Sequence, residues 1–161
     1  MEEIVLRDLD AYAIQQYQQN RYPVLLIDYV AEAVAGKRAK GHKSFTYNEW
    51  FFPAHFEDEP NVPGFIQIEA LTQMFLMTFL TFEENRGKKT DFVSIENAKF
   101  KRKIIPGERL DITAELTSYR RGLAKGSSRG YVGDELACSL ELVIVVPDVL
   151  NQFIPQGKKS Q

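Results

Sequence analysis

A long apolar segment, FIQIEALTQMFLMTFLTF at residues 65–82, constrains the fold more than any other part of the chain. Pro63 stands just before it, where the restricted backbone of proline favours the first turn of a helix. Gly87 and three cations stand within 86–89, just after it, where a helix end favours them. We therefore predict one helix that runs from Pro63 to about Asn85.

This segment is long enough to cross a membrane, but its first half carries polar side chains, among them Glu69. A carboxylate at the centre of a bilayer costs about 2.5–3.5 kcal/mol on insertion scales. We therefore expect the helix to be buried in protein, with no membrane span. Because it is apolar on nearly every face, other parts of the protein must cover it on nearly every face.

Segments typical of strands lie on both sides of the helix in the sequence. Alternation is clearest at 109–117, where Leu110, Ile112, Ala114 and Leu116 share one face and polar residues occupy the other. Proline and glycine turns separate the later segments. The predicted elements besides the long helix are a short helix at 8–19 and strands at 22–34, 38–47, 91–104, 109–121, 126–134 and 135–147.

Two strands before the helix and about four antiparallel strands after it can form one curved sheet. Such a sheet covers one side of the helix, and a second copy of the chain is the simplest cover for the other side. The sequence therefore predicts an α+β domain, in which an antiparallel sheet wraps around a long central helix, and a homodimer.

The composition limits the class of protein. With 161 residues the chain is long enough for a substantial core, and we treat 1–161 as a single domain. Its net charge of −2 argues against general affinity for nucleic acid. The single Cys138 excludes an internal disulfide and cannot build a zinc site alone. It fits a reducing compartment, and the acidic first residues do not resemble a signal peptide, so we expect a cytoplasmic protein.

Three residues in one short window are suited to acid–base chemistry. His55 follows a run of aromatic residues, Gly64 starts the predicted helix, and Glu69 lies inside it. A carboxyl group in a dry site near a histidine is what acid–base catalysis requires, and a free N–H at a helix start can bind an oxyanion. Each residue also has a plain structural explanation: a packed histidine, a glycine that permits close packing, and a carboxylate that caps a loop or pairs with a lysine. His42 is expected to face solvent on a strand, without a role.

The window FFPAHFEDEPNVPGFIQIEALTQ resembles the active-site segment of the 3-hydroxyacyl-[acyl-carrier-protein] dehydratases, whose pattern runs approximately FFxGHFPxxPxxPGxxxxEAxxQ. Residues 21–30, 97–116 and 120–142 resemble further segments of that family in the same order. The likeness covers about residues 12–147 and leaves 148–161 as a polar tail. It implies the hotdog fold, with an antiparallel sheet around a long central helix, and a homodimer that can assemble further into a trimer of dimers.

The resemblance also implies roles for the three residues. It places His55 on the catalytic histidine, Glu69 on the catalytic acid, and Gly64 on the glycine whose N–H holds the thioester carbonyl. His55 would remove the α-proton of a 3-hydroxyacyl thioester, and Glu69 from the partner's helix would protonate the leaving hydroxyl, which yields the trans-2-enoyl thioester. This chemistry requires no metal and no cofactor.

The partner that the resemblance implies is acyl carrier protein, which is acidic, or a related acyl thioester. Lys99, Lys101 and Arg102 supply local positive charge that would steer such a partner, although a solvated strand face explains these residues equally well. The loop before the helix departs from the family, since Ala54 replaces the usual glycine and Glu57 replaces a proline. These departures concern the segment that aims the imidazole.

Three functions compete. The first is a 3-hydroxyacyl thioester dehydratase. The second is a hotdog thioesterase, in which a helix carboxylate activates water and His55 has no assigned part. The third is a non-catalytic module that binds acyl chains or serves for dimerisation, which only the altered loop at 57–59 favours. The pair of His55 and Glu69 favours the dehydratase.

Overall fold

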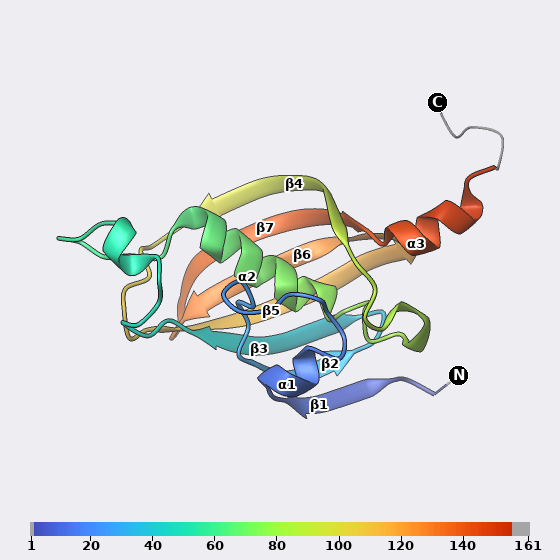
Figure 1. The fold of residues 1–161 in the computed structure, drawn as a ribbon, viewed down its shortest axis with the longest axis horizontal. Coiled ribbons are helices and arrows are strands. Elements are labelled where there is room, and N and C mark those ends of the chain that lie inside the picture. Colours follow the sequence, from blue (N-terminus) through green and yellow to red (C-terminus); the bar gives the residue numbers. More distant parts are fainter. Residues whose placement is uncertain (1, 156–161) are drawn as a thin grey trace.

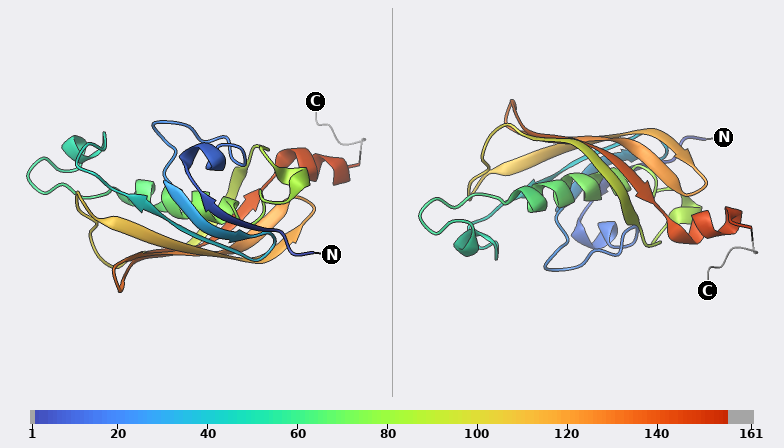
Figure 2. Two further views of the ribbon diagram at one scale, coloured as in Figure 1. Left: turned by 90° about the horizontal axis from the view of Figure 1, so that it is seen from below. Right: turned by 90° about the horizontal axis from the view of Figure 1, so that it is seen from above.

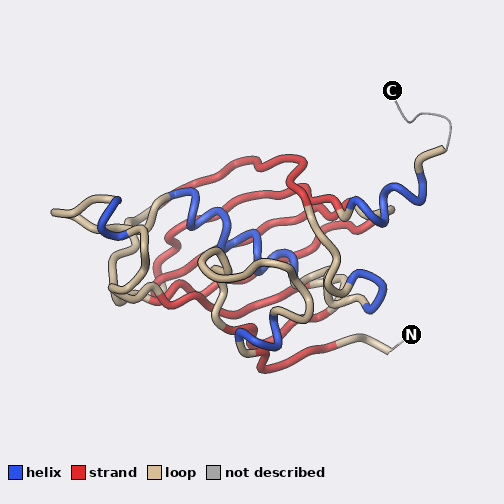
Figure 3. The backbone as a smooth tube through the Cα atoms, viewed as in Figure 1, coloured by secondary structure: helices blue, strands red, loops and turns tan. Residues whose placement is uncertain are grey.

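A sheet of seven strands, all paired antiparallel, forms the body of the molecule in the computed structural model, which describes residues 2–155 (Figures 1 and 3). The order across the sheet is β1-β2-β3-β5-β6-β7-β4. The strands are β1 (Val5–Leu9), β2 (Tyr29–Val34), β3 (Arg38–Ser44), β4 (Asp91–Phe100), β5 (Arg109–Arg120), β6 (Leu123–Val132) and β7 (Glu135–Val145).

Helix α2 (Gly64–Leu76) lies along one face of the curved sheet, which wraps partly around it (Figure 2). Glycines in the central strands permit this close packing. A Cβ added at Gly41 would lie 2.8 Å from Met74 Cε, and one at Gly126 would lie 2.5 Å from Phe75 Cε2. Both helix side chains are fully buried. The predicted α+β architecture, with a sheet wrapped around a central helix, is confirmed.

The prediction that the helix reaches Asn85 is wrong, because α2 ends at Leu76. The apolar chain beyond it stays buried but tightens into turns, where the N–H of Phe79 donates to the carbonyl of Leu76 at 3.2 Å. Groups outside the helix take carbonyls that a longer helix would use. The N–H of Gly36 donates to Thr78 at 2.7 Å, and the amide of Asn85 donates to Phe79 at 2.9 Å. A 3₁₀ helix, η2 (Glu83–Asn85), closes this segment.

The N-terminal part contains a strand that the pattern did not predict. Strand β1 forms the edge of the sheet beside β2, and most of its residues are exposed, so it carries no clear alternation. The helix predicted at 8–19 is confined to α1 (Ala11–Ile14), where Asp10 Oδ1 accepts a hydrogen bond from the N–H of Ala13 at 2.8 Å. Three strands therefore precede α2 rather than two.

The strand predicted at 22–34 begins only at Tyr29, and a helix side chain explains the difference. Gln73 Oε1 accepts from the N–H of Leu26 at 2.6 Å, and Gln73 Nε2 donates to the carbonyl of Val24 at 2.7 Å. Because one glutamine satisfies these two backbone groups, the segment needs no strand partner. The strands predicted to reach 47 and 104 also end earlier, at Ser44 and Phe100.

Two predicted features of the C-terminal half are confirmed. The turns fall where proline and glycine stand, at 106–107, 121–122 and 133–134. On β5, Leu110, Ile112 and Ala114 are buried while their polar neighbours are not.

The predicted polar tail is partly helical where it is described. The chain continues through α3 (Pro147–Leu150) and η3 (Asn151–Phe153), and residues 156–161 lie outside the described part. Gly122 packs tightly here, since a Cβ at this position would lie 2.8 Å from the backbone of Leu150. Among residues 2–155, no helix combines the length and the hydropathy needed to cross a bilayer.

Candidate active site

His55 lies in the loop between β3 and α2, just after the short helix η1 (Phe52–Ala54). Its Nδ1 is 3.1 Å from the carbonyl oxygen of Asn61, and its ring stacks on Phe56 with centroids 4.5 Å apart. Because a carbonyl can only accept, Nδ1 carries the hydrogen in this bond, and in the neutral ring Nε2 is then the nitrogen with the lone pair. The ring is therefore oriented as a base at Nε2.

Gly64 stands beside His55, and both line one pocket of about 430 Å³. Pro63 provides no side-chain cap to α2, and the first helix N–H groups have no acceptor within the helix. Phe100 of β4 lies close to this helix start, since a Cβ at Gly64 would be 3.3 Å from Phe100 Cζ. The pocket therefore joins an imidazole with a helix N-terminus, which favours negative charge.

Glu69 lies in a different pocket, of about 530 Å³, which is lined mainly by apolar side chains. Trp50, Phe65 and Phe92 are among them. The half-buried carboxylate accepts a hydrogen bond from Gln73 Nε2 at 2.9 Å. It neither pairs with a lysine nor caps a loop among the described residues. The structure thus brings His55 and Gly64 together and leaves Glu69 outside their pocket within one chain.

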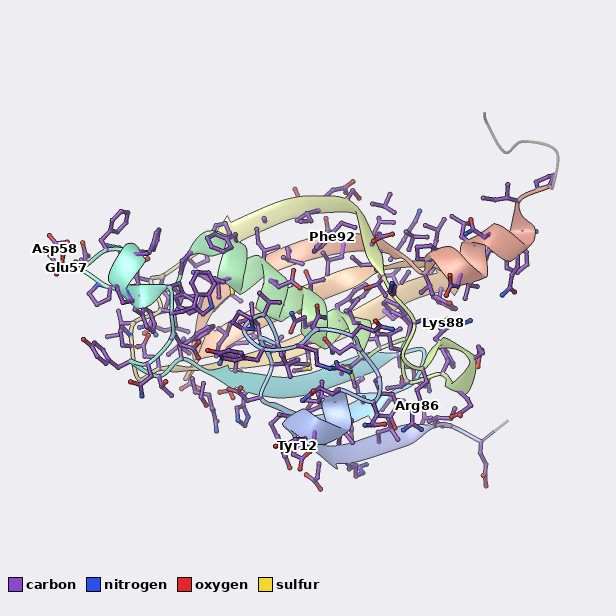
Figure 4. All side chains as sticks on the ribbon, viewed as in Figure 1. Tyr12, Glu57, Asp58, Arg86, Lys88 and Phe92 are labelled. Carbon is purple, nitrogen blue, oxygen red and sulfur yellow. The ribbon has the colours of Figure 1, made fainter. Side chains whose placement is uncertain are left out.

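The acidic turn after His55 does not converge on the imidazole. Glu57 and Asp58 stand at the tip of a loop that projects from the body of the molecule (Figure 4). Glu59 bonds to the ammonium group of Lys103, which itself lines the His55 pocket. Glu59 therefore attaches the altered loop to the wall of the pocket through Lys103, whereas the two carboxylates at the tip of the loop are exposed.

The three basic residues that were assigned to a carrier lie in different surroundings. Lys101 and Arg102 line the His55 pocket. Arg102 is engaged with acids of its own chain, 2.7 Å from Glu108 and 3.9 Å from Glu135. Lys99 lines a separate hollow on the sheet surface. Of the three, Lys101 is the exposed cation at the mouth of the pocket.

Gln67 is a pocket residue that the sequence pattern did not single out. It lies three residues after Gly64, lines the same pocket and is 4% exposed. Its Nε2 donates to the carbonyl of Val62 at 3.0 Å, and its buried Oε1 has no hydrogen-bond partner, the only such side-chain atom among the described residues. An unsatisfied buried acceptor costs about 1–3 kcal/mol. A glutamine in an apolar helix, one turn from the glycine, is the feature that could have indicated it.

Other reactive side chains lie elsewhere. Cys138 is buried, and burial raises the pKa of its thiol to about 12, so it is not a nucleophile at neutral pH. His42 is on β3 and stacks on Tyr29, with ring centroids 5.5 Å apart. Among residues 2–155, no three histidine, cysteine or carboxylate side chains gather into a group that could bind a metal ion.

Comparison with known proteins identifies the class to which this fold and pocket belong. The model of the FabA-like domain matches residues 19–141, and the chain therefore belongs to the FabA-like family.

Similar proteins within this family carry the name of one enzyme. The 3-hydroxyacyl-[acyl-carrier-protein] dehydratase FabZ of Alkaliphilus metalliredigens is 41% identical over 139 residues, which cover 86% of this chain and 95% of that relative. The FabZ of Bacillus cereus is 41% identical over 140 residues, covering 87% and 97%. These relatives confirm the predicted dehydratase family.

A solved structure confirms the fold. The dehydratase heterocomplex ApeI:P from Xenorhabdus doucetiae matches with a TM-score of 0.72 at 14% identity, covering 89% of this chain and 97% of that one. The hotdog fold predicted from the sequence is therefore present.

Proposed function

We propose that this protein removes water from a 3-hydroxyacyl thioester carried on acyl carrier protein and yields the trans-2-enoyl thioester. The relatives at 41% identity bear the name of this activity. The observation that carries the proposal is the placement of His55 and Gly64 in one pocket, with Nδ1 of the imidazole held by Asn61. This arrangement supplies a base and an oxyanion site within reach of one ligand.

In the proposed reaction His55 Nε2 takes the α-proton, and the electron pair of that C–H bond forms the new double bond. Negative charge builds up on the thioester oxygen as the proton leaves. The N–H of Gly64, at the start of α2, donates to that oxygen and lowers the barrier. The 3-hydroxyl leaves with the electrons of the C–O bond and needs a proton from an acid.

Glu69 is that acid in our proposal, and it acts in the pocket of the other subunit. The helix and β4 run in opposite directions, because Gly64 lies near Phe100 whereas Glu69 shares its pocket with Phe92 and Ile95. Two β4 edges that pair antiparallel about a two-fold axis bring the Phe100 end of one next to the Phe92 end of the other. Glu69 of the partner subunit would then face the His55 pocket.

Strand β4 supports this dimer because it is an edge strand with exposed apolar side chains. Phe92, Val93, Ile95 and Phe100 are each between 40% and 56% exposed. An uncovered apolar edge of this kind is a template for pairing with another chain. Phe65, 63% exposed on α2, extends the same surface. Assembly of such dimers into a trimer of dimers stays a prediction.

The carrier would dock at the mouth of the His55 pocket. Lys101 offers an exposed ammonium group there, and Arg102 and Lys103 add positive charge that acids of this chain partly neutralise. An acidic carrier would be steered by this charge. We further propose a cytoplasmic location, which fits the single buried thiol.

The deciding experiment is incubation of the purified protein with 3-hydroxyacyl and enoyl thioesters, on carrier protein and on coenzyme A, followed by mass spectrometry. We expect loss of water from the first and gain of water by the second, without added metal or nucleotide. Release of free acid would instead identify a thioesterase. Unchanged substrates, bound but not converted, would identify a non-catalytic module.

A further inference from the structure

We propose that Gln67 binds the 3-hydroxyl group of the substrate through its Oε1 atom and holds the same oxygen as it departs as water. This inference rests on the proposed function. It starts from a buried polar atom that the folded chain leaves without a partner, on a residue that lines the pocket of His55 and Gly64.

The orientation of the Gln67 amide follows from its contacts. Nε2 is 3.0 Å from the carbonyl of Val62, and a carbonyl can only accept, so the nitrogen must lie on that side. Oε1 is therefore the group on the other side, where it has no partner within residues 2–155. By contrast, Gln73 in the same helix has both ends of its amide bonded. The unpaired acceptor is thus a property of Gln67, the glutamine of this helix that lines the His55 pocket.

The chemistry of the ligand limits what can fill this position. The unpaired Oε1 of Gln67 needs a hydrogen-bond donor. The reacting part of a 3-hydroxyacyl thioester has only one donor, the 3-hydroxyl. The thioester carbonyl accepts, and in the proposed function it is held by Gly64. Gln67 lies three residues after Gly64 along α2, about 4.5 Å of helix rise. This spacing suits the substrate, in which the carbon that bears the 3-hydroxyl lies two carbons from the thioester carbonyl carbon.

An acceptor at this position also suits the departure of the hydroxyl. The 3-oxygen must keep a lone pair free for the proton that Glu69 of the partner subunit supplies. Oε1 binds the hydroxyl through its hydrogen and leaves the lone pairs of the oxygen open, whereas an N–H at this position would compete for them. When the C–O bond breaks, the oxygen keeps that electron pair and gains the proton of the acid. It leaves as water still bonded to Gln67.

The test compares two ligands that differ only in the hydroxyl. Binding of 3-hydroxyoctanoyl and octanoyl carrier-protein thioesters is measured by calorimetry on the Glu69→Gln variant, which slows turnover, with and without Gln67→Met. Loss of one buried hydrogen bond should weaken the 3-hydroxy ligand about 3–10-fold and leave the octanoyl ligand unchanged. Methionine fills nearly the same volume, so packing is retained.

A conservative variant separates binding from loop support, because Gln67→Met also removes the bond to Val62. Protonated Gln67→Glu can donate to Val62 and keep a carbonyl oxygen where Oε1 lies. We expect it to retain the preference for the 3-hydroxy ligand in mildly acidic buffer. It also serves as the second variant should Gln67→Met fail to fold, which circular dichroism would show.

The outcomes are distinguishable. If Gln67→Met weakened the binding of both ligands equally, Oε1 would accept a hydrogen bond from a water, the partner subunit or the carrier arm. That result would overturn the inference. An unchanged preference would overturn it too, while the dehydratase assignment would stand if the wild-type enzyme releases water. A wild-type enzyme that converts no 3-hydroxyacyl thioester would remove the proposed function and the inference together.

Discussion

One contact, the 3.1 Å approach of His55 Nδ1 to the carbonyl of Asn61, sets which ring nitrogen can take a proton. The loop closes on itself to make this contact, since the N–H of Asn61 also donates to the carbonyl of His55 at 3.0 Å. One hydrogen bond holds the ring and a second closes the loop backbone, although Glu57, where the family has a proline, extends into solvent (Figure 4). The altered tip is therefore compatible with a positioned base.

We expect His55→Ala and Glu69→Gln each to lower kcat by about 10²–10⁴-fold, the usual contribution of a positioned acid or base. Steady-state turnover of a 3-hydroxyacyl thioester at saturating concentration measures this effect. His42→Ala is the matched control, because it removes the other histidine from β3 and should leave the rate near that of the wild type. Near-normal turnover in either site variant would exclude the acid–base pair.

At the scale of secondary structure, α2 organises its surroundings through polar side chains as well as through its apolar faces. Gln73 holds the segment before β2 through Val24 and Leu26 and also orients Glu69. This one residue links the position of a loop to the position of the proposed acid. Sequence patterns treat the same glutamine as an interruption of an apolar helix.

Replacing Gln73 with leucine should lower the free energy of unfolding by about 1–3 kcal/mol, because the N–H of Leu26 is then buried without an acceptor. Urea unfolding at a fixed protein concentration measures the change. Gln19→Leu is the control, since the hydrogen bond of Gln19 to Gly87 is exposed and should be worth about 0.5 kcal/mol or less. Equal stability of the two variants would contradict this account of the segment.

The edge strand β4 is the second element with a testable role. Val93→Lys places a charge on the apolar edge at a residue that lies between the paired positions of β4 and β7. Burial of an unpaired ammonium group costs several kcal/mol, so we expect the proposed dimer to dissociate in size-exclusion chromatography with light scattering. Val5→Lys on β1, the opposite edge, is the control and should leave the dimer intact. A dimer that survives Val93→Lys would point to another interface.

At the scale of the whole molecule, one chain divides the proposed site residues between two pockets. His55 and Gly64 line one pocket, and Glu69 lines another. If two-fold pairing joins the two pockets, each dimer contains two complete sites, and no monomer contains one.

Mixing inactive His55→Ala chains with inactive Glu69→Ala chains should therefore restore activity. After random exchange of subunits about half of the dimers are mixed, and each mixed dimer has one site with both groups intact. About a quarter of all sites should then be active. Turnover, measured as a function of the time allowed for subunit exchange, follows this recovery. No recovery, with exchange verified by mass spectrometry, would show that both groups act within one chain.

Charge at the pocket mouth should affect carrier-bound substrates selectively. We expect Lys101→Glu to lower kcat/KM for carrier substrates, and short thioesters without carrier to be affected less. Higher salt should weaken the wild-type preference, because exposed charges are screened. Lys125→Glu, which makes the same charge change beside a different hollow, is the control. Equal losses on both substrate types would contradict docking at this surface.

The sequence alone determined the features that depend on neighbouring residues: the alternation of β5, the proline and glycine turns, the start of α2 and the family motif around His55. Tertiary structure decided the rest, because the deciding hydrogen bonds join distant residues. The N–H of Gly36 takes the carbonyl of Thr78 beyond the end of α2, and Gln73 replaces a strand partner for Leu26. The separation of Glu69 from the His55 pocket follows from the path of α2 past β4, which no local pattern encodes.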